Sequence, residues 1–204
     1  VLLAETGSNL FHRAAAGGGK IFLVWQSFRS GSSDIWLRAL DAGAWTPEVR
    51  VSESAANDWE PAVAASADGS AFVAWDGYDK GNYDVFFRSW QQGRLSRVEA
   101  VAATPKFEAH AAVAADSKGG AWVAWNESGV NWGKDQGFLI PAPLAVPLHQ
   151  QRDIRVAARS GGQWLEPRAP FDAMAGNSEH PQLAFDRWGA LVMVFRHWTR
   201  RASR

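Results

Sequence analysis

The sequence predicts an all-β fold, a β-propeller of about four four-stranded blades. A short segment rich in Val, Ala and aromatic residues returns four times, at residues 20–25, 70–75, 120–125 and 190–195. The last residues of these copies are 50, 50 and 70 positions apart: Trp25, Trp75, Trp125 and Phe195. A period of this size, with turn residues between short apolar runs, is typical of propellers and other repeat folds. We expect these four aromatic residues to be buried between blades.

The second repeat shows the elements of one blade in order. A first strand at 60–65 leads through a turn ending in Gly69 to a second strand at 70–75. Glycine supplies the positive φ that such a turn requires. A polar loop follows, then a third strand at 84–90 and a fourth at 94–101. Four strands joined by turns form one propeller blade.

The first strands are unusually rich in alanine, as residues 62–65 and 111–115 show. Intrinsic propensity alone would favour helix for these runs. The flanking Asp-Gly-type turns and the length of about six residues favour strand instead. Small side chains also fit the crowded centre of a propeller, whereas Trp and Phe fill the wider part of each blade.

We predict a single domain, 1–204, whose repeats lie at about 5–52, 53–101, 102–170 and 171–204. The third repeat carries an insertion at 127–152, and the fourth has no clear third or fourth strand. Residues 1–4 resemble the end of a fourth strand. We therefore favour a segment of a larger ring of six to eight blades. The alternative is a closed four-bladed ring in which residues 1–4 pair with the last blade.

Composition excludes several classes of protein. The chain has 21 basic and 21 acidic residues, so its formal net charge is zero. This balance argues against a surface built for bulk binding of nucleic acid. No apolar run approaches the ~18 residues of a membrane helix, so no membrane insertion is expected. The chain lacks cysteine, which excludes disulfides and thiolate chemistry.

One pattern recurs: Pro-x-x-Ala, a turn ending in Gly, Val-Ala-Trp, a polar loop, and Asp-(Ile/Val) leading to Arg. It is clearest over residues 60–125 and resembles the sialidase-like (BNR-type) propeller repeats of secreted bacterial proteins. The resemblance implies a propeller, a glycan ligand and a secreted or periplasmic location. Residues 74–84 are also similar to a propeller found beside a metal-dependent phosphoesterase-like domain in bacterial proteins.

The sequence departs from the sialidase pattern at its most specific points. The family's Asp box survives only as Gly-x-Trp, at 43–45 and 162–164. Sialidase chemistry also implies three arginines, an acid and a Tyr–Glu pair. The two tyrosines, Tyr78 and Tyr83, both lie in one loop, and no arginine triad occupies matching repeat positions. We therefore assign no catalytic residues and lean towards a chain that is not itself an enzyme.

Titratable side chains recur where the first strand of each blade begins: His12, Glu60, His110 and His180. In a propeller these positions ring the axis. A ring of His and Glu could bind a metal ion, an anion or a sugar. The alternative is that each side chain caps its own loop.

A second polar group follows the second strand of blade two: Asp76, Asp79, Asn82 and Asp84. Its oxygens could hold calcium, but the spacing does not match the known calcium loop. An Asp also recurs at the start of the third strands, at Asp34, Asp84 and Asp153, where capping of the loop is the simpler explanation. We predict no metal ligands and assign no cofactor.

The insertion would project from the same face as the His and Glu ring, and it carries Trp132 and Lys134. Long loops on a regular scaffold are often functional. The alternative is a cover over a blade edge or a contact with another domain. Three tryptophans could stack on sugar rings: Trp59, Trp132 and Trp198.

These observations favour a non-catalytic recognition or scaffolding module of a larger bacterial protein that binds a glycan or a protein. The alternatives are part of a sialidase-like glycoside hydrolase and an accessory domain of a metal-dependent phosphoesterase. Open blade edges would favour self-association. The predicted ligand-binding residues are Glu60, Asp76, Asp79, His110, Trp132, Lys134 and His180.

Overall fold

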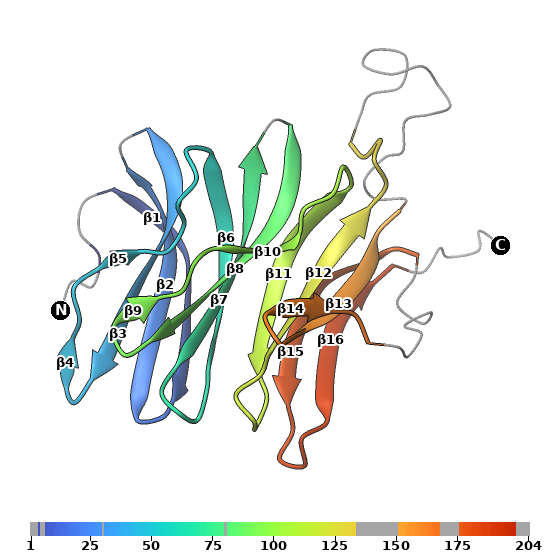
Figure 1. Ribbon diagram of the computed structural model, residues 1–204. Coiled ribbons are helices and arrows are strands. Elements are labelled where there is room, and N and C mark those ends of the chain that lie inside the picture. The colour runs from blue at the N-terminus through green and yellow to red at the C-terminus, as the bar shows by residue number, and fades with distance from the viewer. Residues whose placement is uncertain are drawn as a thin grey trace.

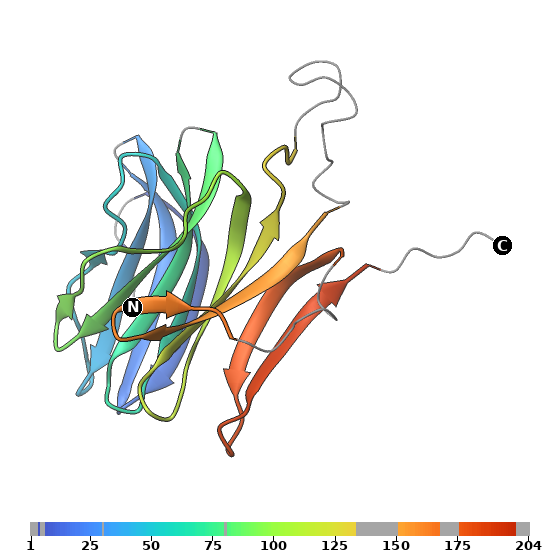
Figure 2. The same ribbon diagram turned by 45° about the vertical axis from the view of Figure 1, so that its right-hand side comes forward.

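The computed structural model describes residues 4, 7–29, 31–79, 81–133, 151–167 and 176–198. These residues form strands and turns and contain no helix. The strands make four antiparallel sheets, which stand face to face in chain order and are seen from two directions in Figures 1 and 2. The all-β fold predicted from the repeats is confirmed.

Blades one and two have the same order of strands. In blade one the strands are β1 (Ser8–Gly17), β2 (Lys20–Arg29), β3 (Ser32–Asp41), β4 (Ala44–Trp45) and β5 (Val49–Arg50). In blade two they are β6 (Asn57–Ala65), β7 (Ala71–Asp79), β8 (Asn82–Gln91), β9 (Arg94–Leu95) and β10 (Glu99–Ala102). In each blade the first three strands pair in sequence and two short pieces pair with the third strand.

Blades three and four follow the same order as far as they are described. The third comprises β11 (Phe107–Ala115), β12 (Ala121–Ser128), β13 (Asp153–Ser160) and β14 (Gln163–Leu165). The fourth comprises β15 (Ser178–Phe185) and β16 (Leu191–His197). The third strand of blade three thus begins at Asp153, as predicted, although the insertion separates it from β12.

The fourth strand of a blade is not the continuous element that the sequence suggested. In blade two the break lies at Ser96, whose hydroxyl accepts a hydrogen bond from the Ser89 N–H at 3.1 Å. In blade one Thr46 does the same for the Ala39 N–H at 3.0 Å. Because a side-chain oxygen takes a place in the ladder, the backbone turns away and pairs again further on. The predicted strand therefore becomes two short pieces.

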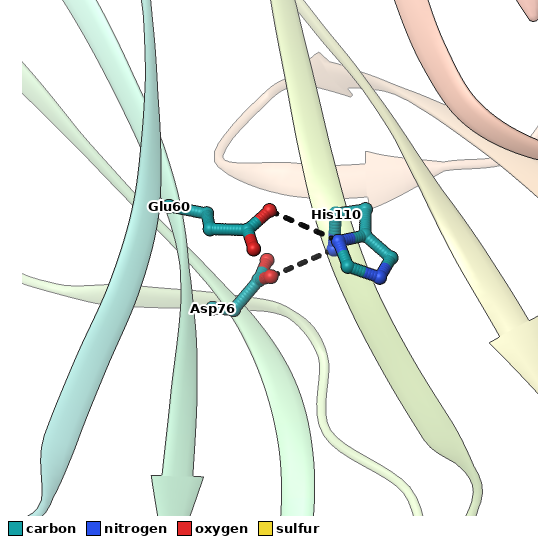
Figure 3. Close-up of side chains that lie close together, drawn as sticks. All are labelled: Glu60, Asp76 and His110. Carbon is teal, nitrogen blue, oxygen red and sulfur yellow. Dashed lines mark hydrogen bonds and ion pairs between the residues drawn. The ribbon is translucent and has the colours of Figure 1, made fainter. Parts of the chain in front are cut away.

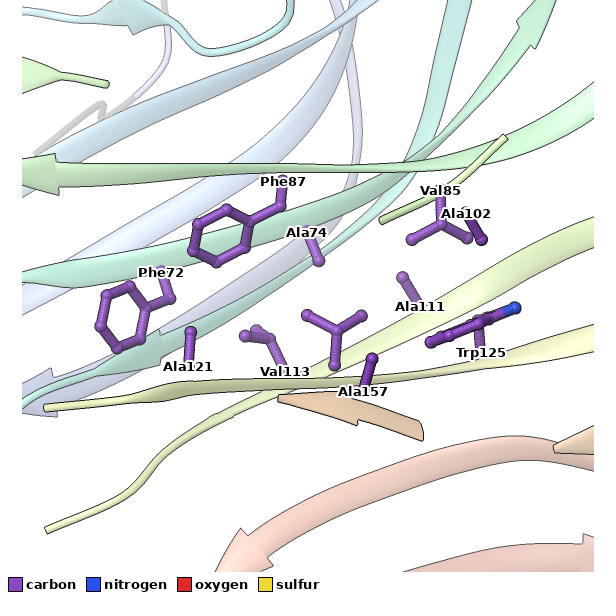
Figure 4. Close-up of a cluster of buried hydrophobic side chains, with 11 residues drawn as sticks. Phe72, Ala74, Val85, Phe87, Ala102, Ala111, Val113, Ala121, Trp125 and Ala157 are labelled. Atoms are coloured by element: carbon purple, nitrogen blue, oxygen red, sulfur yellow. The ribbon is translucent and has the colours of Figure 1, made fainter. Parts of the chain in front are cut away.

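Each hydrophobic core lies between two neighbouring blades. Between blades two and three, Phe72 and Phe87 lie at one end of a buried cluster that includes Val113, and Trp125 lies at the other end, as Figure 4 shows. Corresponding clusters lie between blades one and two and between blades three and four. Trp25, Trp75 and Trp125 are all buried, as predicted.

Phe195 differs from these three tryptophans. It packs against the cluster between blades three and four but is only half-buried. The prediction of a buried Phe195 is therefore only partly correct, because the described part of the chain places a blade on one side of it.

The innermost strands of the four blades lie side by side. β6 contacts β1 and β11, and β11 contacts β15. The alanine-rich runs in β6 and β11 are strands and not helices, as the turns predicted. Their small side chains let neighbouring blades approach closely, so the innermost strands converge.

Candidate functional site

Each innermost strand contains a β-bulge at the same point of its repeat. The register shifts after Leu10, Trp59, Ala109 and Glu179. The next residue has a positive φ in every blade: Phe11 (49°), Glu60 (45°), His110 (58°) and His180 (53°). A bulge redirects a side chain, and Glu60, His110 and His180 line a common pocket between the innermost strands, whereas Phe11 is 44% exposed and lies outside that lining.

The register corrects one sequence prediction. Leu10 pairs with Gln26 as Trp59 pairs with Asp76, so Phe11 occupies the position of Glu60. His12 is the second residue of its bulge and matches Pro61. The expected ring of His12, Glu60, His110 and His180 is therefore wrong in its first member, because the turn length in blade one misled the alignment.

A side chain of the preceding blade holds each later bulge in place. The residue after the buried aromatic anchor is Gln26, Asp76 or Asn126. Gln26 Oε1 accepts the N–H of Glu60 at 3.2 Å, and Asn126 Oδ1 accepts the N–H of His180 at 2.9 Å. We call this contact the inter-blade clamp. It ties blades together at the point where the pocket residues lie.

The clamp between blades two and three differs because Asp76 replaces an amide. Asp76 Oδ2 accepts the His110 N–H at 2.7 Å, and Oδ1 accepts the Ala111 N–H at 3.2 Å. The other two bulges have proline where blade three has Ala111, at Pro61 and Pro181. Proline has no N–H to offer. An amide with one oxygen thus faces one donor, and a carboxylate with two oxygens faces two.

Three of the predicted residues come together at the axis, as Figure 3 shows: Glu60, Asp76 and His110. Glu60 Oε2 lies 3.0 Å from His110 Nδ1, although 50 positions separate the two residues. The ring of His180 stacks on that of His110, with centroids 4.3 Å apart and an angle of 25° between the planes. The structure therefore joins residues from blades two, three and four into one cluster.

The electrostatics of the cluster follow from burial and pairing. Burial raises the pKa of Asp76 to about 7, against the opposing effects of His110 and of the two backbone N–H groups. The bond to His110 lowers the pKa of Glu60. The pKa of His110 is raised because Glu60 and Asp76 together outweigh its burial. Burial and the nearby His110 charge lower the pKa of His180.

A pocket of about 240 Å³ opens beside this cluster, between the innermost strands. Its polar lining includes Arg13, Glu60, His110 and His180, and its walls include Val63 and Val113. The volume is below the roughly 300–1,000 Å³ of pockets for drug-sized ligands. The axial pocket, as we call it, therefore has room for one small polar group such as a single sugar ring. No pattern in the sequence indicated that Arg13 would line this pocket.

Glu60, Asp76 and His110 also have side-chain atoms within 4.8 Å of one another, a spacing that could suit a metal ion. Their hydrogen bonds account for this proximity without one. Both oxygens of Asp76 accept backbone N–H groups, and Glu60 is paired with His110. We therefore treat the cluster as a hydrogen-bonded unit.

Asp79 and Trp132, two further predicted residues, are absent from the lining of the axial pocket. Asp79 is exposed at the end of β7, where it pairs with Asn82 across a hairpin. Asn82 donates a hydrogen bond to Asp84 at 3.0 Å, the arrangement of a capped loop. Asp79 therefore belongs to this loop rather than to the axial cluster. Lys134 falls outside the described residues.

Trp132 is half-buried and anchors the beginning of the insertion. Its indole N–H donates to Asn82 Oδ1 at 3.3 Å, and its ring lies 5.0 Å from Phe107 and 5.8 Å from Tyr83. Phe107 in turn lies 6.1 Å from His110. Trp132 thus reaches the cluster only through a buried neighbour, and its contacts tie blade three to blade two.

Blade four has a cation at the position of the clamp acceptor. Arg196 stands at the position of Asp76 and Asn126, and Glu179 stands at the position of Trp59. Glu179 accepts hydrogen bonds from Arg196 at 3.0 Å and from the Trp198 indole at 2.8 Å, and it is also paired with Arg152. The indole of Trp198 therefore has a structural partner, although its side chain is 59% exposed.

These sheets, cores and converging inner strands define a β-propeller. Solved structures with the same fold include carbohydrate-active enzymes. The endo-arabinase of Bacteroides thetaiotaomicron matches with a TM-score of 0.58 and 11% identity, over 95% of this chain and 74% of its own. The α-L-arabinanase of Penicillium chrysogenum, solved with arabinobiose, matches with a TM-score of 0.54 and 12% identity, over 91% and 57%.

The Trypanosoma rangeli sialidase in complex with sialic acid matches with a TM-score of 0.57 and 9% identity, over 94% of this chain and 34% of its own. The predicted resemblance to sialidase-like propellers is thus confirmed at the level of fold. No protein-family model matches the chain, and no curated protein matches it. This chain spans between a third and three quarters of the length of these three structures.

Proposed function

We propose that the chain is a carbohydrate-recognition propeller whose axial pocket holds one sugar ring. The observation that carries the proposal is the convergence of Glu60, His110 and His180 on a pocket of that size. A carboxylate and imidazoles can accept and donate hydrogen bonds to hydroxyl groups. The solved propellers named above act on or bind sugars, which supports the same class of ligand here.

Recognition is favoured over hydrolysis by this chain. Most glycoside hydrolases place two carboxylates on either side of the scissile bond. Among the described residues that line the pocket, Glu60 is the one carboxylate. Asp76 is 2% exposed, and both of its oxygens accept backbone hydrogen bonds. A catalytic role, or an accessory role beside a phosphoesterase-like domain, remains a separate prediction.

The proposal also places the protein where glycans are encountered, in the periplasm or outside the cell. Within the described part of the chain, no helix is long and apolar enough to cross a membrane. Fractionation of the native host, with the chain detected by antibody, tests this location. Recovery of all the protein from the cytoplasm would contradict it.

A glycan array followed by calorimetry tests the function. Arabinobiose and sialic acid, the ligands of two structural neighbours, serve as first probes. We expect a glycan that binds the wild type to bind the His110→Ala/His180→Ala variant about tenfold or more weakly, the effect of one or two lost hydrogen bonds. His12→Ala is the matched control, because His12 lies outside the pocket lining, and it should bind normally. Binding that survives the double change would place the site elsewhere.

A further inference from the structure

The stacked rings of His110 and His180 are too close for both to be positively charged. Their centroids lie 4.3 Å apart and their planes are nearly parallel. Two imidazolium ions at this separation repel each other strongly in the partly buried setting of the pocket. An imidazolium over a neutral imidazole is instead an attractive cation–π arrangement. The geometry therefore disfavours two charged rings, so at most one of them carries an extra proton near neutral pH.

The surrounding groups decide which ring carries the proton. Glu60 Oε2 lies 3.0 Å from Nδ1 of His110, and the buried carboxylate of Asp76 belongs to the same cluster. The positive charge of Arg152 opposes protonation of His110. The Glu60 carboxylate stabilises a positive charge on His110, and Asp76 adds to this effect when it is ionised. In Figure 3 the second ring nitrogen of His110 points away from both carboxylates.

His180 faces a different set of charges. Glu179 Oε2 lies 3.7 Å from its Nδ1, but that carboxylate already pairs with Arg152 and Arg196. The charges of Arg196, Arg152 and His110 all oppose protonation of His180, and Glu60 alone among its remaining neighbours favours it. The balance therefore leaves His180 as the neutral ring.

We propose that His110 and His180 form an unequal pair, an imidazolium and a neutral imidazole, which together offer a hydroxyl-bearing ligand one N–H donor and one nitrogen acceptor. A hydroxyl group both donates and accepts, so a sugar with neighbouring hydroxyls can satisfy both rings at once. The inference rests on the proposed function for its ligand, but not for the state of the two rings. The raised pKa of His110 and the lowered pKa of His180 agree with it.

An NMR titration of the imidazole signals of the whole chain tests the inference without a ligand. In the wild type we expect the midpoint of His110 to lie above the ordinary 6.5 and that of His180 to lie below it. Glu60→Gln should lower the midpoint of His110, because it removes the nearest carboxylate. His110→Asn should raise the midpoint of His180, because it removes the adjacent charge.

The control is His12→Asn, which should leave both midpoints unchanged. Equal midpoints in the wild type, a higher midpoint for His180, or a His180 midpoint unmoved by His110→Asn would overturn the inference. Because these measurements need no sugar, their outcome is separate from that of the glycan array. If the two histidines titrate unequally but no glycan binds, only the proposed function is contradicted. If a glycan binds but His110 and His180 titrate with equal midpoints, only the inference of an unequal pair is contradicted.

Discussion

At the scale of single residues, Asp76 combines two roles that its counterparts do not. Like Gln26 and Asn126, it holds the bulge of the next blade. Unlike them, it brings a buried charge next to His110. Burial disfavours the ionised carboxyl, whereas the two N–H donors and His110 favour it. Burial prevails, so its pKa rises and the charge of the cluster depends on pH.

The raised pKa of Asp76 predicts how stability changes with pH. It is about 7 in the folded protein and 3.8 ordinarily. Between pH 3.8 and about pH 7, Asp76 is therefore protonated in the folded chain and ionised in the unfolded chain. The corresponding stability is fully present below about pH 4 and is lost as pH rises through 7. Asp76→Asn should therefore cost less free energy of unfolding at pH 8 than at pH 5. Urea denaturation at both values measures this, and a cost that grows with pH would contradict it.

Trp75 shows the cost of removing an anchor. It is 1% exposed, packs between blades one and two, and donates a hydrogen bond to Asp58 at 3.0 Å. Trp75→Ala should lower the free energy of unfolding by about 3–5 kcal/mol, as for large buried aromatic residues. Trp188→Ala is the control. Trp188 is 76% exposed, and its replacement should change stability by less than about 0.5 kcal/mol. Equal losses of stability for Trp75→Ala and Trp188→Ala in chemical denaturation would contradict the assignment of Trp75 to the core.

At the scale of elements, the repeating unit is a bulge on one blade and an acceptor on the preceding blade. The bulge of β11 offers two N–H groups to a carboxylate, whereas those of β6 and β15 offer one to an amide. Acceptor and bulge sequence therefore match in each pair, and a change in one should require a change in the other.

This match predicts that Ala111→Pro lowers stability in the wild type but raises it in the Asp76→Asn variant. Asp76→Asn should destabilise the protein by about 1–3 kcal/mol, because the Ala111 N–H is left facing an amide that can accept only one bond well. Ala111→Pro should also destabilise the wild type, because it removes a donor from a buried carboxylate. Together they reproduce the pairing of Asn126 with the Pro181 bulge. The double variant should be more stable than Asp76→Asn alone.

Thermal denaturation of the four proteins at pH 8 measures the cycle, since Asp76 is then mostly ionised. Additive losses in the double variant would show that the pairing of acceptor and bulge has no energetic weight.

At the scale of the whole molecule, the last described blade presents an apolar face. Val192 is 44% exposed and Val194 is 65% exposed. Their counterparts in blade two, Phe72 and Ala74, are buried against blade three. Arg196 occupies the place of the clamp acceptor, and its guanidinium cannot accept a hydrogen bond. The face is therefore suited to apolar contact but lacks the clamp that joins the other blades.

We expect the chain to self-associate weakly through this face, as the open edges in the sequence suggested. Light scattering at several concentrations should show a mass that rises with concentration. Val194→Glu should suppress the rise, because it places a charge in the contact. Glu53→Gln, a change at an exposed position on blade one, is the control. A monomeric mass at high concentration in the wild type would rule out this association.

The sequence by itself determined the order of the strands within each blade and the buried anchors Trp25, Trp75 and Trp125. These follow from local patterns, since a repeat that places Trp75 after an apolar run places Trp25 and Trp125 in the same way. It also identified Glu60, His110 and His180 as residues at the axis. It did not locate the break in the fourth strands, because that depends on a hydroxyl of Thr46 or Ser96 entering the ladder.

Only the tertiary structure decided which side chains meet. Glu60 and His110 pair across 50 positions, and His180 stacks on His110 from the next blade. These contacts depend on the bulge register, where a shift of one residue moves a side chain to the other face. The same register gives Phe11, and not His12, the bulge position that Glu60 holds in blade two. The charge of the pocket is set by distances between blades, and no local pattern in the chain specifies those distances.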